Sequence, residues 1–216
     1  VGSEMCIRDR SYVLYHLTQE HLKHMLFPVG ELEKPQVRAV AHEAGLGNAD
    51  KLESQDICFV PDGDYATFIE EHTGATFVPG PIVDEAGTVL GKHYGLVHYT
   101  IGQRKGLGVA AGHPLFVLKK DAKTNTLVVG PATSAGVHEV VANDVNLISV
   151  AEIAEPLTVE AKVNYRATPH KAVVRMKGEK LIVTFEEPVR AVAPGQAMVL
   201  YQGDVVVGGG TIESTR

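Results

Sequence analysis

The chain changes character at residues 53–65, which read ESQDICFVPDGDY. Before this stretch, apolar residues recur at helical spacing. After it, short runs of apolar and β-branched residues are separated by turn signals. The stretch itself combines proline, glycine and acidic residues, which are typical of loops and helix starts. The sequence therefore predicts a mostly β protein with an α-helical N-terminal segment.

Cys58 lies in the middle of this stretch and has two interpretations. A free cysteine is often buried and only fills space. A thiol near a helix N-terminus can instead have its pKa lowered from about 8.5, which favours the reactive thiolate. The carboxylates of Asp56 and Asp62 would oppose that shift if they came close. The sequence leaves a structural and a reactive Cys58 both open.

Composition narrows the class of protein. The chain has 216 residues, of which 44% are hydrophobic and 21% charged, as in ordinary globular proteins. Its net charge of −6 argues against indiscriminate nucleic-acid binding but allows a local basic patch. Two cysteines, Cys6 and Cys58, cannot form a disulfide framework, so we expect a reducing, cytoplasmic location. No apolar run approaches the roughly 20 residues of a membrane span, and we expect no membrane association.

The N-terminal segment contains two helical patterns. Residues 1–10 show no periodicity, and we interpret them, together with Cys6, as a non-native leader. The first helical region covers residues 12–27, where Thr18 is a candidate cap for a second segment and Pro28 ends the pattern.

A clearer helix follows, with Pro35 in its first turn and Gly45 just past its end. After Cys58 the sequence predicts a short helix that is capped by Asp62 or Asp64 and ends by Gly74.

The rest of the chain reads as strands. Two hairpins are predicted, one joining residues 82–83 to 89–90 and one joining residues 116–118 to 127–129. The last third contains many short strands with turn signals at close intervals, which is typical of a barrel or a sandwich. We expect a central β-rich domain over residues 58–135 and a C-terminal β-barrel over residues 136–216.

A glycine-rich loop, GQRKGLG at residues 102–108, places Arg104 and Lys105 between glycines. Backbone amides and two cations in such a loop can bind phosphate. The spacing does not match a Walker motif. A tight structural loop with solvated charges is the alternative.

A second candidate lies in the last third, where residues 162–166 read KVNYR. Cations, an amide and an aromatic ring can together hold phosphates and stack on a base. A solvated strand end is the alternative. Gln196, in a turn before an apolar strand, is a candidate donor either to a nucleic acid or to its own turn. The ten histidines lack zinc-site spacing, so we interpret them as surface residues and predict no metal.

Together, these segments resemble one family. The chain is similar to the C-terminal part of the bacterial tRNA-specific 2-thiouridylases, which thiolate the wobble uridine of tRNA. The resemblance covers residues 11–216 and rests on separated motifs in the same order, at residues 11–15, 26–38, 54–59, 100–108, 165–166, 185–196 and 208–212.

The resemblance implies a function and a set of site residues. In this family ATP adenylates the target uridine, and a cysteine persulfide then delivers sulfur. Cys58 aligns with the persulfide-bearing cysteine, and Asn164, Tyr165 and Gln196 align with positions that touch tRNA. We add Arg104 and Lys105 as tRNA contacts. The implied partners are tRNA and a sulfur-relay or desulfurase protein that donates the persulfide.

The family's ATP-binding loop and its second catalytic cysteine have no counterpart in this sequence. We therefore expect residues 11–57 to be the helical tail of the missing ATP-pyrophosphatase domain, with no ATP site in this chain. We also expect that the chain does not thiolate tRNA alone. The alternative is a non-catalytic tRNA-binding β-barrel module in which Cys58 is structural.

Overall fold

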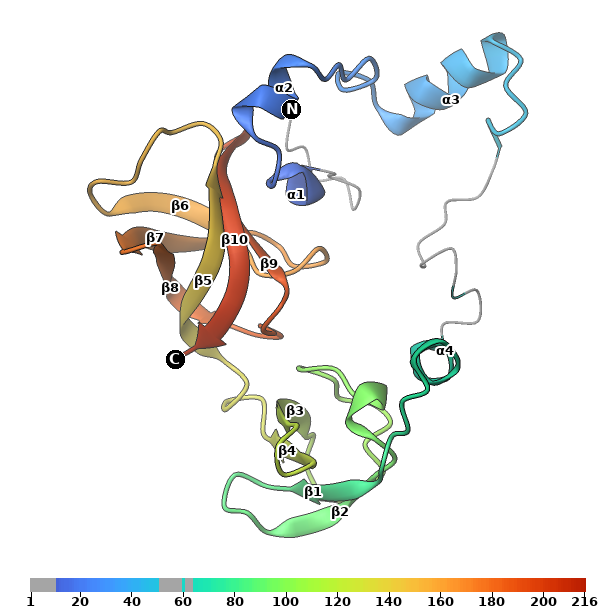
Figure 1. Ribbon diagram of the computed structural model, residues 1–216, viewed down its shortest axis with the longest axis vertical. Helices are drawn as coiled ribbons and strands as arrows, with labels where there is room; N and C mark the ends of the chain where they lie inside the picture. Colours follow the sequence, from blue (N-terminus) through green and yellow to red (C-terminus); the bar gives the residue numbers. More distant parts are fainter. Residues whose placement is uncertain (1–10, 51–59, 61–63) are drawn as a thin grey trace.

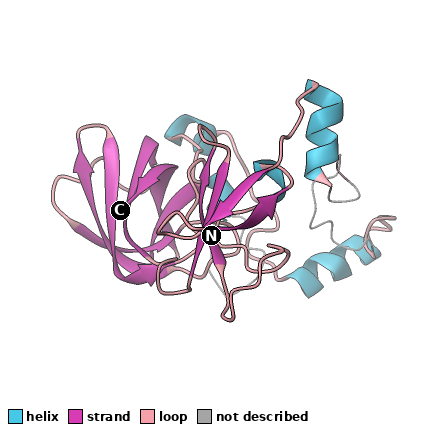
Figure 2. Cartoon of the chain, turned by 90° about the horizontal axis from the view of Figure 1, so that it is seen from below, coloured by secondary structure: helices cyan, strands magenta, loops and turns pink. Residues whose placement is uncertain are grey.

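The computed structural model describes residues 11–50, 60 and 64–216. The described residues form an N-terminal helical segment, a four-stranded sheet and a closed six-stranded barrel (Figure 1). Strands dominate the view in Figure 2, with helices at its right edge and behind the central strands. The prediction of a mostly β fold with a helical N-terminal segment is confirmed. Within the described residues, no helix is long and apolar enough to cross a membrane.

The predicted helical region over residues 12–27 is two short helices, α1 (Ser11–Leu14) and α2 (Gln19–Lys23). Thr18 divides them, because its hydroxyl accepts the backbone N–H of His21 and begins a new helix. The His21 ring in turn accepts the backbone N–H of Thr18, which completes a capping box. The predicted cap at Thr18 is confirmed. The helix ends earlier than Pro28 alone predicts.

The next helix, α3 (Lys34–Glu43), has the predicted boundaries. Pro35 lies in its first turn, and Gly45 follows its end in the left-handed conformation with φ of 65°. None of its residues is buried, and the apolar Val40 is 52% exposed.

The helix α4 (Tyr65–Thr73) is capped by Asp64 and is followed by Gly74 at its C-cap. Thr67 donates its backbone N–H and its hydroxyl to the Asp64 carboxylate, at 3.1 and 2.7 Å. The hydroxyl bond has the larger effect, and together the two bonds hold the pKa of Asp64 below its ordinary value of 3.8. Of the two predicted caps, the structure uses Asp64, whereas Asp62 lies outside the described residues.

This cap predicts a pH dependence. Because the pKa of Asp64 is lower in the folded protein, its carboxylate stabilises α4 above the unfolded pKa, and the stabilisation is lost as the pH falls through the folded pKa. Asp64→Asn keeps an acceptor for the Thr67 N–H but does not titrate. We expect thermal melting between about pH 6 and about pH 3 to show a shallower loss of stability in Asp64→Asn than in the wild type. Parallel curves for the two proteins would contradict this role.

The four-stranded sheet contains both predicted hairpins. Strands β1 (Gly80–Val83) and β2 (Val89–His93) pair antiparallel, as do β3 (Phe116–Asp121) and β4 (Thr126–Gly130). The sheet order is β2-β1-β4-β3, with β1 parallel to β4. A short 3₁₀ helix, η1 (Leu96–His98), and a long loop connect β2 to β3. The core of this part consists of Ile82, Tyr99, Leu107, Leu115, Val117, Leu127 and Val129.

His93 corrects the interpretation of the histidines as surface residues, because its side chain is fully buried in this sheet. Its Nε2–H donates to the Asn125 carbonyl at 3.0 Å, and its Nδ1 accepts the Gly95 N–H at 3.0 Å. Both ring nitrogens are therefore satisfied inside the protein, which is what allows a polar ring to be buried there.

The six remaining strands close into a barrel in the order β10-β5-β8-β7-β6-β9. Closure leaves no free sheet edge and decides between the predicted barrel and sandwich in favour of the barrel. Alternate residues of the strands point inward and form the largest core, which includes Leu181, Met198, Leu200 and Ile212. The strands are β5 (Val137–Leu147), β6 (Leu157–Lys162), β7 (His170–Lys177), β8 (Lys180–Val189), β9 (Ala197–Gln202) and β10 (Val205–Thr215).

Candidate nucleic-acid interface

The glycine-rich loop at residues 102–108 is anchored at its base and exposed at its tip. The Gly102 N–H donates to the Val117 carbonyl at 2.8 Å, and the Val117 N–H donates to the Gln103 carbonyl at 2.9 Å. The Gln103 side chain also bonds the backbone of Thr100 and of Lys105. Leu107 is buried in the sheet core.

Arg104 and Lys105, by contrast, are exposed. The loop is therefore anchored at its base and presents two cations to solvent, as the structural interpretation expects, and phosphate binding by these cations stays a prediction. A hollow of about 240 Å³ lies beside Arg104 and is lined by Gly106, Leu107, Gly108, Val109, His113, Pro114 and Leu115.

Asn164 lies in the turn after β6, and its side chain is used within the barrel. Its Oδ1 accepts the Arg166 N–H at 3.0 Å, and its Nδ2 donates to the Ala191 carbonyl at 3.5 Å. The neighbouring Tyr165 is 41% exposed. Asn164 therefore shapes the turn that presents the Tyr165 ring.

Tyr12, in α1, joins the helical segment to this part of the barrel. Its hydroxyl donates to the Ala197 carbonyl at 2.6 Å, and its ring meets the Tyr165 ring edge-on with centroids 6.0 Å apart. The Lys162 ammonium lies 5.7 Å from the Tyr12 ring centroid. Burial, then the nearby Tyr15 and Tyr201, raise the pKa of Tyr12, so its hydroxyl stays a neutral donor.

Gln196 belongs to the turn that precedes β9, directly before Ala197. Its carbonyl accepts the Ile212 N–H at 2.8 Å, which fixes the turn to β10, and the residue is exposed. Because Tyr12 bonds Ala197 and contacts Tyr165, the fold brings Tyr165 and Gln196 to the same region through Tyr12.

Sequence reasoning missed Tyr12 and did not place Lys162 beside it. Tyr12 stood at the start of a helical pattern and within the family motif at residues 11–15, but neither signal identifies a partner about 150 residues away along the chain. The other predicted site residue, Cys58, lies outside the described residues.

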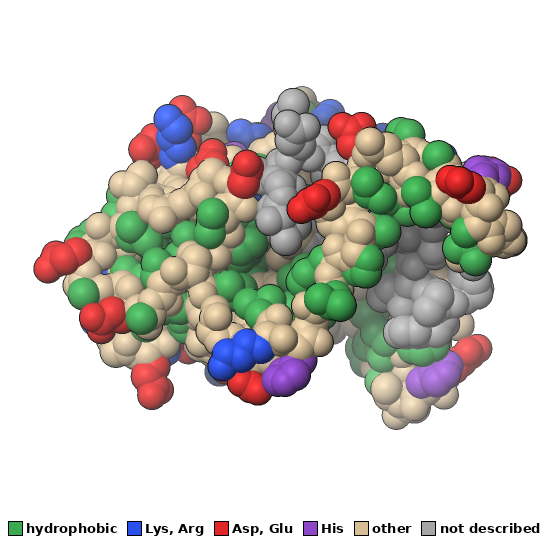
Figure 3. Space-filling model, turned by 90° about the horizontal axis from the view of Figure 1, so that it is seen from above, with side chains coloured by type: hydrophobic (Ala, Val, Ile, Leu, Met, Phe, Trp, Pro, Cys, Tyr) green, Lys and Arg blue, Asp and Glu red, His purple; other side chains and the backbone are tan. Residues whose placement is uncertain are grey.

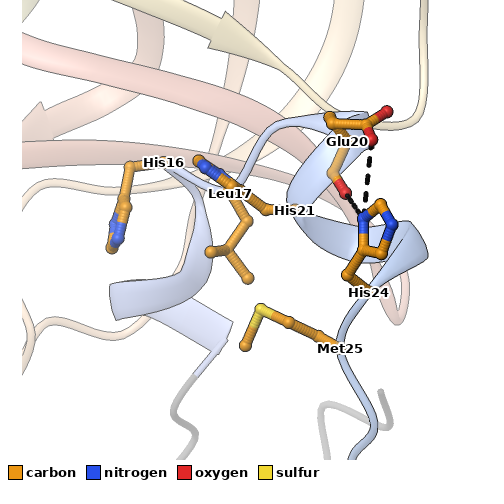
Figure 4. A pocket seen from close by; sticks show the side chains of 6 residues that line it. All are labelled: His16, Leu17, Glu20, His21, His24 and Met25. Atoms are coloured by element: carbon orange, nitrogen blue, oxygen red, sulfur yellow. Dashed lines mark hydrogen bonds and ion pairs between the residues drawn. The ribbon is translucent and has the colours of Figure 1, made fainter.

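A hollow of about 350 Å³ beside α1 and α2 is lined by several histidines (Figure 4). Leu17 and Met25 line it with His16, Glu20, His21 and His24. The His24 Nδ1–H donates to the Glu20 carbonyl at 2.9 Å, and the His21 ring serves the cap at Thr18. Among the described residues, no group of three or more histidine, cysteine or acidic side chains is arranged to hold a metal ion.

The surface around these helices is not uniformly charged. Figure 3 views the molecule from the side of the N-terminal helices and shows hydrophobic side chains between scattered acidic, basic and histidine side chains. Leu26, for example, is 88% exposed. The face drawn in Figure 3 therefore carries no continuous positive patch.

The sequence of the chain was compared with families of known protein domains. Three domain families match consecutive parts of the chain. Residues 3–62 match a tRNA methyl transferase HUP domain, residues 66–131 a tRNA methyl transferase PRC-barrel domain, and residues 137–212 an aminomethyltransferase beta-barrel domain.

Curated relatives match along nearly the whole chain. The tRNA-specific 2-thiouridylase MnmA of Acetivibrio thermocellus is 50% identical over 207 residues, which are 95% of this chain and 58% of the relative. The protein of the same name from Clostridioides difficile is 46% identical over 209 residues, which are 96% of this chain and 58% of that relative. The protein of that name from Heliobacterium modesticaldum is 48% identical over 208 residues, which are 95% of this chain and 54% of the relative. The chain thus spans less than two thirds of the length of these relatives. With this identity along almost its full length, the chain belongs to the family of tRNA-specific 2-thiouridylases.

Proposed function

We propose that this chain is the tRNA-binding and sulfur-carrying part of a tRNA-uridine 2-sulfurtransferase, which forms 2-thiouridine at the wobble position. The observation that carries the proposal is the meeting of the Tyr165 turn, the Gln196 turn and Tyr12 in a protein half identical to named 2-thiouridylases. An exposed aromatic ring beside amide and cationic side chains suits RNA, whose unpaired bases stack on such rings.

In this proposal each residue has a separate role. Tyr165 stacks on a base, Gln196 donates to the RNA, and Arg104 and Lys105 bind its phosphates. Asn164 holds the Tyr165 turn through its bonds to Arg166 and Ala191, which adds a positioning role to the predicted contact.

The sulfur chemistry is assigned to Cys58. Its thiolate attacks the outer sulfur of a donor persulfide, a new S–S bond forms at Cys58, and the donor leaves as a thiolate. The donor is a desulfurase or a sulfur-relay protein. This chemistry requires a reduced thiol, which fits a cytoplasmic setting.

ATP use is not assigned to this chain. The described helix N-termini of α2, α3 and α4 are capped by Thr18, Glu33 and Asp64, two of which are acidic. Acidic caps disfavour a triphosphate, which binds free N–H groups at a helix N-terminus. In this proposal, activation of the uridine by ATP belongs to the part of the relatives that this chain does not match, and we expect no thiolation by this chain alone.

Binding of tRNA tests the proposed interface. We expect Arg104→Ala/Lys105→Ala to weaken binding and to reduce the slope of log affinity against log salt by about 1.5, because each phosphate contact contributes about 0.7–0.9.

We expect Tyr165→Ala to weaken binding of tRNA by about 1–3 kcal/mol through lost stacking, whereas Tyr165→Phe keeps the affinity. Fluorescence anisotropy with labelled tRNA over a salt series measures both.

The matched control is Lys177→Ala/Lys180→Ala, which removes the same charge from the turn between β7 and β8. Lys180 forms a surface ion pair with Glu213 at 2.7 Å, so its loss costs little stability. An equal reduction of the salt slope in both double variants would contradict a specific role for Arg104 and Lys105. Absence of tRNA binding by the wild type would contradict the proposed function.

A further inference from the structure

The glycine-rich loop touches the barrel at one point of very close approach. A Cβ added at Gly102 would lie 2.8 Å from the Ala191 Cβ and 3.1 Å from the Ala191 Cα. Carbon atoms in contact are separated by about 3.5–4.0 Å, so no larger residue fits at Gly102 without moving one loop. The two loops belong to different sheets, since Gly102 precedes β3 and Ala191 follows β8.

Each partner in this contact is fixed to its own sheet. Gly102 is bonded to Val117 of β3, as described above. Ala191 accepts a hydrogen bond from Asn164 and has φ of 55°, in the left-handed region that alanine rarely adopts. A strained residue of this kind persists only where the surrounding structure holds it.

Few other described contacts set the placement of the two sheets. Every strand pairing lies within one sheet or the other. The linker between β4 and β5 contacts both sides, through the bond from the Ser134 hydroxyl to Glu85 at 2.8 Å and through Gly136, which packs on Pro188. The contact between Gly102 and Ala191 adds a second point of attachment away from the linker.

We propose that the contact between Gly102 and Ala191 locks the glycine-rich loop to the barrel, so that one folded RNA contacts the loop and the barrel together. Arg104 lies two residues after Gly102, and Ala191 is bonded to Asn164, the neighbour of Tyr165. The lock therefore fixes the spacing between the phosphate-binding cations and the stacking ring. Gly102 and Ala191 are positioning residues, and the RNA part of this inference rests on the proposed function.

The lock is tested first without RNA. Spin labels at Ala86→Cys and Glu179→Cys, in a Cys6→Ala/Cys58→Ala background, report the distance between the exposed hairpin turns of the two sheets. We expect Gly102→Ala to shift or broaden the distance distribution of the wild type. Gly108→Ala is the matched control, because Gly108 has positive φ of 68°, as Gly102 has with 84°, but an added Cβ at Gly108 meets nothing within 4 Å. We expect it to leave the distribution unchanged.

Two further variants keep the test decisive if Gly102→Ala folds poorly. Ala191→Gly removes the methyl group from the contact and relaxes the strained backbone, so the protein folds but the lock loosens. Gly102→Ala/Ala191→Gly moves the methyl group to the other side of the contact, and we expect it to recover part of the wild-type distribution. Equal distributions in Gly102→Ala, Ala191→Gly and Gly108→Ala would overturn the lock.

The RNA readout follows with the natural cysteines in place. We expect Gly102→Ala to reduce the salt slope of tRNA binding by about 1.5, as Arg104→Ala/Lys105→Ala does, because displaced cations no longer reach their phosphates at about 0.7–0.9 each. A loss of stability alone does not change this slope in folded protein. A wild type that shows the narrow distance but no tRNA binding would contradict the proposed function, whereas tRNA binding with an unchanged slope in Gly102→Ala would overturn the RNA role of the lock.

Discussion

Gly209→Ala is expected to destabilise the barrel by about 3 kcal/mol, at the upper end of the usual cost of overpacking. Gly209 lies in β10, where an added Cβ would overlap the Met198 carbonyl oxygen of the paired strand β9. The same Cβ would lie 2.7 Å from Cδ2 of Tyr15. Since the Met198 backbone is part of a closed barrel, it cannot move without disturbing the pairing of β9.

Urea unfolding followed by circular dichroism measures this effect. We expect a lower midpoint with little change in the slope, which shows a change in stability and not in the unfolding mechanism. Gly203→Ala is the control, because Gly203 has φ of 56° in a turn but an added Cβ there meets nothing within 4 Å. It costs only the backbone strain of about 1–2 kcal/mol. An equal or smaller effect of Gly209→Ala would contradict the steric explanation.

Local features of this fold were predictable from the sequence because they depend on neighbouring residues. Caps at Thr18 and Asp64 and helix ends at Gly45 and Gly74 follow from side-chain reach and from the conformational freedom of glycine. The hairpins follow for the same reason, since a short turn joins strands that are adjacent in sequence.

Contacts between distant residues were not predictable. The parallel pairing of β1 with β4 depends on which edges meet after the hairpins form. The barrel itself was predicted, but the strand pattern alone also allowed a sandwich, and only the family resemblance favoured the closed barrel that the structure shows. The burial of His93 depends on the Asn125 carbonyl, which a composition argument cannot supply. The contact of Tyr12 with Tyr165 likewise joins two segments whose patterns are independent.

In the candidate site, too, the individual residues were predictable from the sequence, whereas their arrangement in space was not. Tyr165, Gln196, Arg104 and Lys105 were named from residue type and family resemblance, and the fold leaves all four exposed. Their spatial relation depends on Tyr12 and on the contact between Gly102 and Ala191, neither of which has a local sequence signal.

Cys58→Ala is expected to abolish sulfur loading completely, which is the largest functional effect predicted for this chain. After incubation with a small-molecule persulfide donor, intact-mass analysis should find one added sulfur atom on the wild type and on Cys6→Ala, and none on Cys58→Ala. The physical reason is that only a thiolate attacks the donor's outer sulfur, and removal of the thiol leaves no nucleophile at that position.

The same measurement separates the two functions considered for the chain. An adduct that depends on Cys58 supports a sulfur carrier, and its rate should rise with pH through the pKa of the attacking thiol, because the thiolate fraction rises. A wild type that binds tRNA but stays unmodified at every pH would instead support the non-catalytic tRNA-binding module, in which Cys58 is structural. Because Tyr165→Ala weakens tRNA binding without removing the thiol, it should load sulfur like the wild type. A loss of loading in that variant would show that the fold, and not the Cys58 thiol, limits the reaction.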